Sequence, residues 1–288
     1  MKWFGGSESN DVEEGSSSGG GRGLMFGGGL VGLIGGLIYL FTGINPAQLL
    51  NTNQDNNSQQ INTQPGSGAE SREKQFARVI FQGTTVVWDS LFTAMGKHYE
   101  HPVLHLFSEG VDAEGCGYAS SATGPFYCPQ NQKVYLDLSF FDELQNKFQS
   151  PGEAAGAYVI AHEVGHHVQN LLGVSAQMDE ARNQLSETAY NKLSVKLELQ
   201  ADFYAGVWAH YTAKNNHNNI VIERADIDSA LVAANQIGDD RLQQQYQGRV
   251  TPDSFTHGTS AQRMYWFKKG YDTGDLQQGN TFARNDLP

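Results

Sequence analysis

Cysteine is scarce in this chain of 288 residues, which has only Cys116 and Cys128. Two thiols are too few for an all-cysteine zinc site or a cysteine-ligated iron–sulfur cluster, so a bound metal would depend on histidines and carboxylates. Basic side chains are also in the minority, with 19 Lys and Arg against 31 Asp and Glu and a formal net charge of −12. Because this charge repels phosphate backbones, we expect no nucleic-acid partner.

Apolar side chains are plentiful enough for a core, since 39% of the residues are hydrophobic and 11% aromatic. This composition excludes disorder of the whole chain. The start of the chain differs, because it consists mainly of Gly, Ser, Asn and acidic residues. We therefore expect residues 1–23 to form a disordered cytoplasmic tail.

One long apolar run follows, from 24 to 42, and it contains no charged side chain. Nineteen such residues suffice for a helix that crosses a bilayer, whereas a cleaved signal peptide would have a shorter apolar core and a small-x-small cleavage site. Lys2 and Arg22 precede the run, and the next basic residue is Arg72. The positive-inside rule thus predicts a single-pass membrane protein with a cytoplasmic N-terminus and a periplasmic or other extracytoplasmic domain.

The predicted span carries Gly28, Gly32 and Gly36 at four-residue spacing, which predicts a smooth stripe for weak self-association. A helix that is merely rich in glycine explains the spacing equally well. Residues 43–68 are mostly Asn, Gln, Ser and Thr, which indicates a flexible linker, and we expect the main domain to cover residues 69–288.

The main domain is predicted to be α+β and mainly helical, with a small antiparallel sheet. Helical periodicity begins near residue 76, and short β-prone runs with Gly and Pro occupy residues 102–138. Further helices are predicted at about 152–172, 176–213, 224–247 and 259–273.

The two cysteines are close in sequence, and in an extracytoplasmic domain Cys116 and Cys128 would form a disulfide. Closing such a loop would stabilise the fold by roughly 3 kcal/mol on the chain-entropy model. Two buried free thiols are the alternative.

An H-E-x-x-H motif lies within the predicted helix 152–172, as His162-Glu163-Val164-Gly165-His166. Four-residue spacing puts His162 and His166 one turn apart on the same face, where both imidazoles can reach one Zn²⁺ with Glu163 beside them. A helix with ordinary surface histidines is the alternative.

A catalytic zinc needs a third protein ligand and an open position for water. The metzincin pattern is excluded, because Gln169 and Leu172 stand where Gly and His would be required. Glu198 and Asp202 lie one turn apart on a second predicted helix, in a segment too apolar for a solvated face. We expect Glu198 to bind the metal and Asp202 to orient a ligating histidine through a hydrogen bond.

Several segments together resemble a known family: HEVGHHVQNLLG, ELQAD, CGYASSATGPFYCP with KVYLDLSFF, and HGTSAQRMYWFKKGYDTGD. They are similar to the bacterial neutral zinc metallopeptidases with one N-terminal membrane span, over essentially all of residues 70–280. The H-E-x-x-H and E-x-x-A-D pair is also similar to CAAX prenyl endopeptidases, HtpX-like peptidases and, more distantly, thermolysin. The resemblance implies a zincin-like domain of the gluzincin type, with one zinc held by two His and one Glu.

The expected activity is hydrolysis of a peptide or protein substrate, with Glu163 taking a proton from a zinc-activated water. His257 is a candidate donor to the oxyanion, and a loop or capping histidine is the alternative. A substrate would lie along a strand edge, for which residues 133–138 are the candidate, although they equally suit an interior strand. Two other functions remain open: a non-catalytic envelope protein that binds partners or acts as a chaperone, and hydrolysis of a non-peptide amide.

Overall fold

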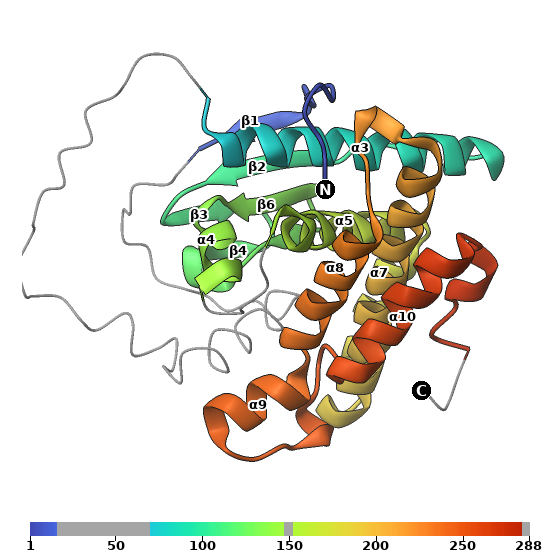
Figure 1. The fold of residues 1–288 in the computed structure, drawn as a ribbon. Coiled ribbons are helices and arrows are strands. Elements are labelled where there is room, and N and C mark those ends of the chain that lie inside the picture. The colour runs from blue at the N-terminus through green and yellow to red at the C-terminus, as the bar shows by residue number, and fades with distance from the viewer. Residues whose placement is uncertain (16–69, 147–151, 284–288) are drawn as a thin grey trace, which may run out of the picture.

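Helices dominate the computed structural model, which describes residues 1–15, 70–146 and 152–283 (Figure 1). The α-helices are α3 (Arg72–Ala94), α4 (Ser139–Asn146), α5 (Glu153–Leu171), α6 (Val174–Gln184), α7 (Glu187–Asn215), α8 (Arg224–Gln236), α9 (Asp239–Gln247) and α10 (Ser260–Thr273). The strands are β1 (Val12–Glu14), β2 (Val103–Phe107), β3 (Gly110–Ala113), β4 (Gly117–Ser120), β5 (Phe126–Cys128) and β6 (Lys133–Asp137). Short 3-10 turns are η1 (Ser121–Thr123), η2 (His217–Asn219), η3 (Pro252–Ser254) and η4 (Leu276–Gly279). The α+β class with mainly helical content is confirmed.

The main sheet has the strand order β1-β2-β6-β5 and is mixed, so the prediction of a small antiparallel sheet is wrong for it. β2 pairs in parallel with both β1 and β6, and only β5 runs antiparallel to its neighbour β6. β3 and β4 form a separate antiparallel hairpin. The candidate substrate edge at residues 133–138 is wrong as well, because β6 lies between β2 and β5. Among the described strands, β1 and β5 are the edges of this sheet.

The predicted disulfide is confirmed, since Cys116 is bonded to Cys128 with 6.0 Å between their Cα atoms. It joins the turn between β3 and β4 to the end of edge strand β5. The hairpin is therefore fixed to the main sheet by a covalent bond as well as by packing.

The first 15 residues are ordered, so the prediction of a disordered tail is wrong for them. Trp3 is 1% exposed, and its ring packs edge-on against Phe76 of α3 with 5.5 Å between the centroids. The Met1 ammonium group lies 2.5 Å from a carboxylate oxygen of Asp226, near the start of α8. β1 then adds a parallel strand to β2. One buried aromatic ring and the sheet hydrogen bonds hold a segment whose composition is otherwise polar.

The predicted localisation, a single-pass chain with a cytoplasmic N-terminus and an extracytoplasmic domain, is wrong. A single crossing between residues 24 and 42 would leave the first 15 residues and the domain on opposite sides of a bilayer, yet β1 is a strand of the domain's own sheet. No helix in the described part of the chain is long and apolar enough to cross a membrane. The predicted span 24–42, its Gly28, Gly32 and Gly36 stripe and the linker 43–68 lie outside the described residues.

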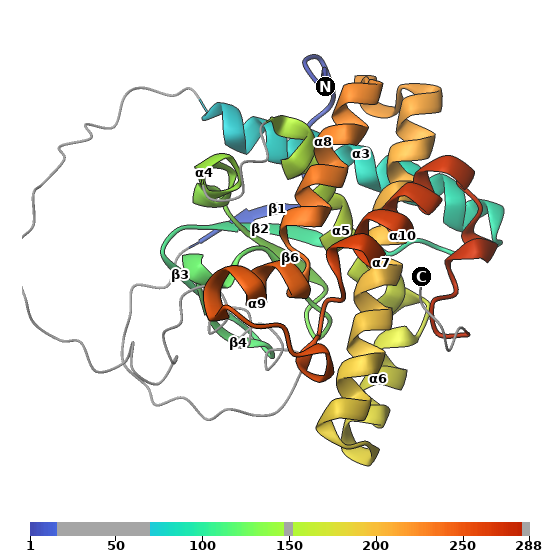
Figure 2. The same cartoon turned by 60° about the horizontal axis from the view of Figure 1, so that its bottom comes forward.

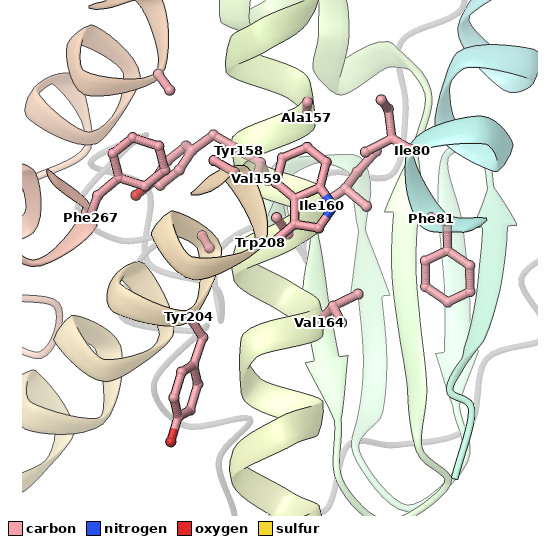
Figure 3. Close-up of a cluster of buried hydrophobic side chains, with 14 of the residues drawn as sticks. Ile80, Phe81, Ala157, Tyr158, Val159, Ile160, Val164, Tyr204, Trp208 and Phe267 are labelled. Carbon is pink, nitrogen blue, oxygen red and sulfur yellow. The ribbon is translucent and has the colours of Figure 1, made fainter. Parts of the chain in front are cut away.

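Helix α5 lies at the centre of the core, in contact with α3, α7, α8 and β5. Its side chains are buried almost all round, as the apolar sequence Ala154–Ala161 requires of a helix with neighbours on every side. Figure 3 shows this packing: Tyr158 and Ile160 of α5 lie among Ile80 of α3, Trp208 of α7 and Phe267 of α10. The H-E-x-x-H motif thus belongs to the most enclosed helix of the fold.

Candidate metal centre

Three side chains from two helices meet beside the core. His162 and His166 extend from α5 and Glu198 from α7, and one potential ligand atom of each lies within 4.8 Å of the others. Nε2 of His162 is 3.2 Å from one oxygen of the Glu198 carboxylate, and Nε2 of His166 is 3.5 Å from the other. Two imidazole nitrogens and a carboxylate are therefore arranged around one point.

Glycine at position 165 allows the two helices to approach this closely (Figures 1 and 2). A Cβ atom there would lie 3.0 Å from the carbonyl oxygen of Ala201 and 3.2 Å from its Cα, closer than nearly all real Cβ contacts. The middle of the H-E-x-x-H motif is thus the point where α5 packs on the backbone of α7. A side chain at Gly165 would push Glu198 away from both histidines.

Asp202 lies one turn beyond Glu198 and is fully buried. One carboxylate oxygen is 2.9 Å from Nδ1 of His162 and accepts a hydrogen bond from the Tyr158 hydroxyl at 2.5 Å. Arg263 of α10 donates to the same carboxylate through Nε at 2.8 Å and Nη2 at 3.0 Å. Burial raises the pKa of Asp202, but the charges of Arg263 and His162 outweigh it and lower the pKa to about 2. Asp202 is therefore ionised and orients His162 so that Nε2 faces Glu198.

His166 is oriented by a neutral partner. Its Nδ1 lies 2.8 Å from Oε1 of Gln169, which follows it by three residues on α5. Gln169 itself is fully buried and bonds to α7. The Nε2 atoms of both histidines are thus left facing Glu198, which is the arrangement a metal ligand needs.

Burial perturbs the two glutamates of the site in opposite directions. Burial raises the pKa of Glu163, and no described side chain donates a hydrogen bond to its carboxylate. Burial also raises the pKa of Glu198, but the charges of His166 and His257 and the hydrogen bonds with His162 outweigh it, so this pKa lies well below its usual range. Glu198 is consequently a permanent anion, whereas Glu163 combines a carboxylate free to accept a proton with an environment that favours the protonated form.

His257 lies in the loop before α10, near enough to Glu198 for their charges to interact. Asp239, the first residue of α9, holds this loop: its carboxylate accepts hydrogen bonds from the backbone N–H groups of Thr256, His257 and Gly258 at 2.8, 2.6 and 3.0 Å. Nδ1 of His257 is 3.3 Å from the second oxygen of Asp239. Burial lowers the pKa of His257, but Glu198 and Asp239 outweigh it and raise this pKa. The imidazole is therefore a proton donor at the border of the site.

Other residues have roles that sequence reasoning missed. Tyr158 precedes His162 by one turn, so its position on the same face of α5 could have been noted. Arg263 stands alone as a charge within the apolar run Met264–Phe267 and its surroundings, which is a signal for a buried ion pair. Gln169 and Asp239 act through contacts with segments distant in sequence, which no local pattern indicates.

His167 is not part of the group. It points away from the ligand face of α5, its Nδ1 lies 3.0 Å from the hydroxyl of Tyr127 on β5, and its Nε2 donates to the carbonyl of Glu100 at 2.6 Å. Burial lowers the pKa of His167 to about 4. This neutral histidine fastens β5 to the helix that carries the site.

No solved structure matches the chain. The uncharacterized protein YpfJ of Escherichia coli K12 is 45% identical over 292 residues, which cover 99% of this chain and 100% of that protein. The uncharacterized protein Mb2605 of Mycobacterium bovis is 42% identical over 228 residues, 77% of this chain and 75% of its own length. Residues 1–282 match the family described as "Putative neutral zinc metallopeptidase", and the chain therefore belongs to that family.

Proposed function

We propose that this protein is a zinc-dependent peptidase that hydrolyses peptide bonds with Glu163 as its general base. One observation carries the proposal: Nε2 of His162, Nε2 of His166 and the carboxylate of Glu198 converge on one point, with Glu163 next to a ligand on the same helix. Membership of a zinc metallopeptidase family supports the choice of metal and reaction.

The donor set suits zinc. Two histidine nitrogens and one carboxylate are a ligand set of catalytic zinc sites, which keep a further position open for water. Asp202 and Gln169 occupy the Nδ1 atoms, so both imidazoles present Nε2 to the metal. Zinc bound by His162, His166 and Glu198 would acidify a water molecule and polarise the substrate carbonyl.

Glu163 accounts for the proton transfers. Its carboxylate takes a proton from the attacking water while the new C–O bond forms, and it then passes this proton to the amide nitrogen as the C–N bond breaks. Burial, which raises the pKa of Glu163, favours the intermediate stage at which the residue holds the proton. The amine leaves uncharged, and Glu163 returns to its ionised form.

His257 is our candidate for stabilising the oxyanion. Asp239 orients its ring through Nδ1, and a raised pKa keeps a proton available on the imidazole. A donor held in place before the reaction stabilises the developing negative charge without a reorganisation cost. Asp239 would then act as a positioning residue for His257.

The substrate backbone is proposed to lie along β5, in place of the strand 133–138. β5 is an outer strand of the described sheet, and its Tyr127 contacts both His167 and Asn170 of α5. An extended peptide can add to such an edge through main-chain hydrogen bonds, which depend little on side-chain identity. This arrangement would bring a peptide beside the helix that carries Glu163.

The test is Glu163→Gln, because glutamine has nearly the same shape but cannot accept the proton. Zinc content and the unfolding midpoint should stay at the wild-type values, whereas cleavage of an unstructured peptide mixture, followed by mass spectrometry, should fall by about 10²–10⁴-fold. Glu180→Gln, at an exposed position on α6, is the matched control and should change none of these quantities. Wild-type protein that holds one zinc and cleaves no peptide would contradict the proposal and favour the non-catalytic binding protein.

A further inference from the structure

Two glutamines connect the candidate metal ligand His166 to the end of the described chain. Nε2 of Gln169 donates to the carbonyl of Leu197 at 2.7 Å and to Oε1 of Gln200 at 3.1 Å. Nε2 of Gln200 donates in turn to the carbonyl of Gly279 at 2.9 Å. Gln169 is fully buried and Gln200 is 6% exposed, so water does not replace these bonds.

The direction of this chain of hydrogen bonds follows from its two backbone carbonyls. A carbonyl oxygen can only accept, so Gly279 requires the NH₂ group of Gln200, and Leu197 requires the NH₂ group of Gln169. Oε1 of Gln169 is then the atom that faces Nδ1 of His166. An oxygen at this place accepts the Nδ1–H proton, which leaves the lone pair of His166 on Nε2.

The segment that ends the described chain is itself fastened to α7. The hydroxyl of Thr281 donates to the carbonyl of Lys196 at 2.6 Å, and the Lys196 ammonium group lies 3.4 Å from the carbonyl of Phe282. Gly279 lies so close to the ring of Phe203 that a Cβ atom at this position would collide with it. Residues 276–283 are therefore packed along the helix that carries Glu198.

We propose that Gln169 and Gln200 are positioning residues that hold His166 as an Nε2 ligand, and that residues 276–283 complete this support. The inference rests on the proposed zinc function. It assigns the two histidines different supports: His162 is backed by the ionised Asp202, and His166 by an uncharged amide whose orientation is set by the chain's last described segment. A carboxylate at 169 could not donate to Leu197 and would face its carbonyl oxygen.

The experiment uses the full chain with ¹⁵N-labelled histidine. Zinc affinity is measured by competition with a chelator, and the imidazole N–H signals of the zinc-loaded protein are recorded by NMR. Gln169→Met should weaken zinc binding by about 10–100-fold and remove the slowly exchanging Nδ1–H signal of His166, while the signal of His162 persists. Gln200→Met should cause a smaller loss in the same two readouts, because the bond from Gln169 to Leu197 is retained. A stop codon after Asp275 should behave like Gln200→Met.

Gln243→Met is the matched control. Gln243 is also a buried glutamine, 1% exposed, with hydrogen bonds to Ser254 and Thr251, but it does not contact His166. Equal losses in this control, or unchanged His166 signals and zinc affinity in Gln169→Met and Gln200→Met, would overturn the inference while the zinc site itself stands. Wild-type protein that binds no zinc would instead overturn the proposed function, and the inference with it.

Discussion

Replacing Asp202 with Asn is the sharpest test of how the site is built, because one carboxylate serves three partners. It accepts hydrogen bonds from Tyr158 and Arg263 and lies 2.9 Å from Nδ1 of His162. Asparagine keeps the shape but offers one acceptor oxygen and no charge. The guanidinium of Arg263, which is 3% exposed, would then be buried without an opposite charge.

Two separate losses are expected from Asp202→Asn. Removing one partner of a buried ion pair costs about 3–5 kcal/mol, because the remaining charge is uncompensated. The weaker orientation of His162 should also reduce zinc affinity by about 10–100-fold, as is typical when the partner of a ligand is changed. The first loss concerns the free energy of unfolding and the second concerns metal binding, so the two are measured separately.

Urea unfolding with chelator present gives the first quantity, and zinc competition gives the second. The double variant Asp202→Asn with Arg263→Met removes both charges, so it should recover part of the stability but none of the zinc affinity. Asp272→Asn, in the exposed pair with Lys268, is the control and should cost no more than about 1 kcal/mol. A change in unfolding free energy below about 0.5 kcal/mol for Asp202→Asn would refute the reasoning, since that is the range of ordinary surface substitutions. Complete loss of zinc in this variant, with zinc retained in Glu198→Ala, would make Asp202 the ligand.

Three further outcomes are expected. The pKa of His167 is lowered to about 4, so its contribution to stability is present above the unfolded value of 6.5 and is lost as the pH falls through 4. This loss, about 3 kcal/mol from a shift of 2.5 units, should be absent in His167→Gln when unfolding free energies at pH 7 and pH 4 are compared. Replacing Cys116 and Cys128 together with Ser should lower the unfolding free energy by about 3 kcal/mol, and wild-type protein under reducing conditions should match the variant in the same urea titration. Gly165→Val should separate α5 from α7 and weaken zinc binding by at least about 10-fold in a chelator competition, as loss of ligand geometry predicts.

Helical periodicity in the sequence predicted most helices but joined two pairs of them. The predicted helix 176–213 is α6 and α7, separated where Ser186 accepts a hydrogen bond from the N–H of Ala189 as an N-cap. The predicted helix 224–247 is α8 and α9, separated at Gly238, where a Cβ atom would collide with the backbone of Ser260. The first break has a local signal in the sequence. The second depends on a segment 22 residues away, so no window of residues around Gly238 contains its cause.

The N-terminal segment shows why composition misled the sequence analysis. Residues 1–15 are polar and glycine-rich, which is typical of disorder, but their order depends on partners about 60 to 220 residues away, as the long separations of these contacts imply. Trp3 needs the surface of Phe76, and β1 needs the free edge of β2. A parallel strand pairing has no sequence signature at such a separation, because nothing local fixes its register.

The row of polar residues on α7 explains which part of the site could be predicted. Ser194, Glu198 and Asp202 follow one another at four-residue spacing, so they lie along one side of the helix with a drift of about 40° per step. Each is buried and serves a different neighbour: Ser194 donates to the carbonyl of Thr256 beside the candidate oxyanion loop, Glu198 faces the two histidines, and Asp202 binds Arg263. The spacing is visible in the sequence, and it led correctly to a shared face. The neighbours are not, since they come from α5, α10 and the loop between α9 and α10. A helix face therefore predicts which side chains act together, whereas the charges opposite that face decide what each of them can do.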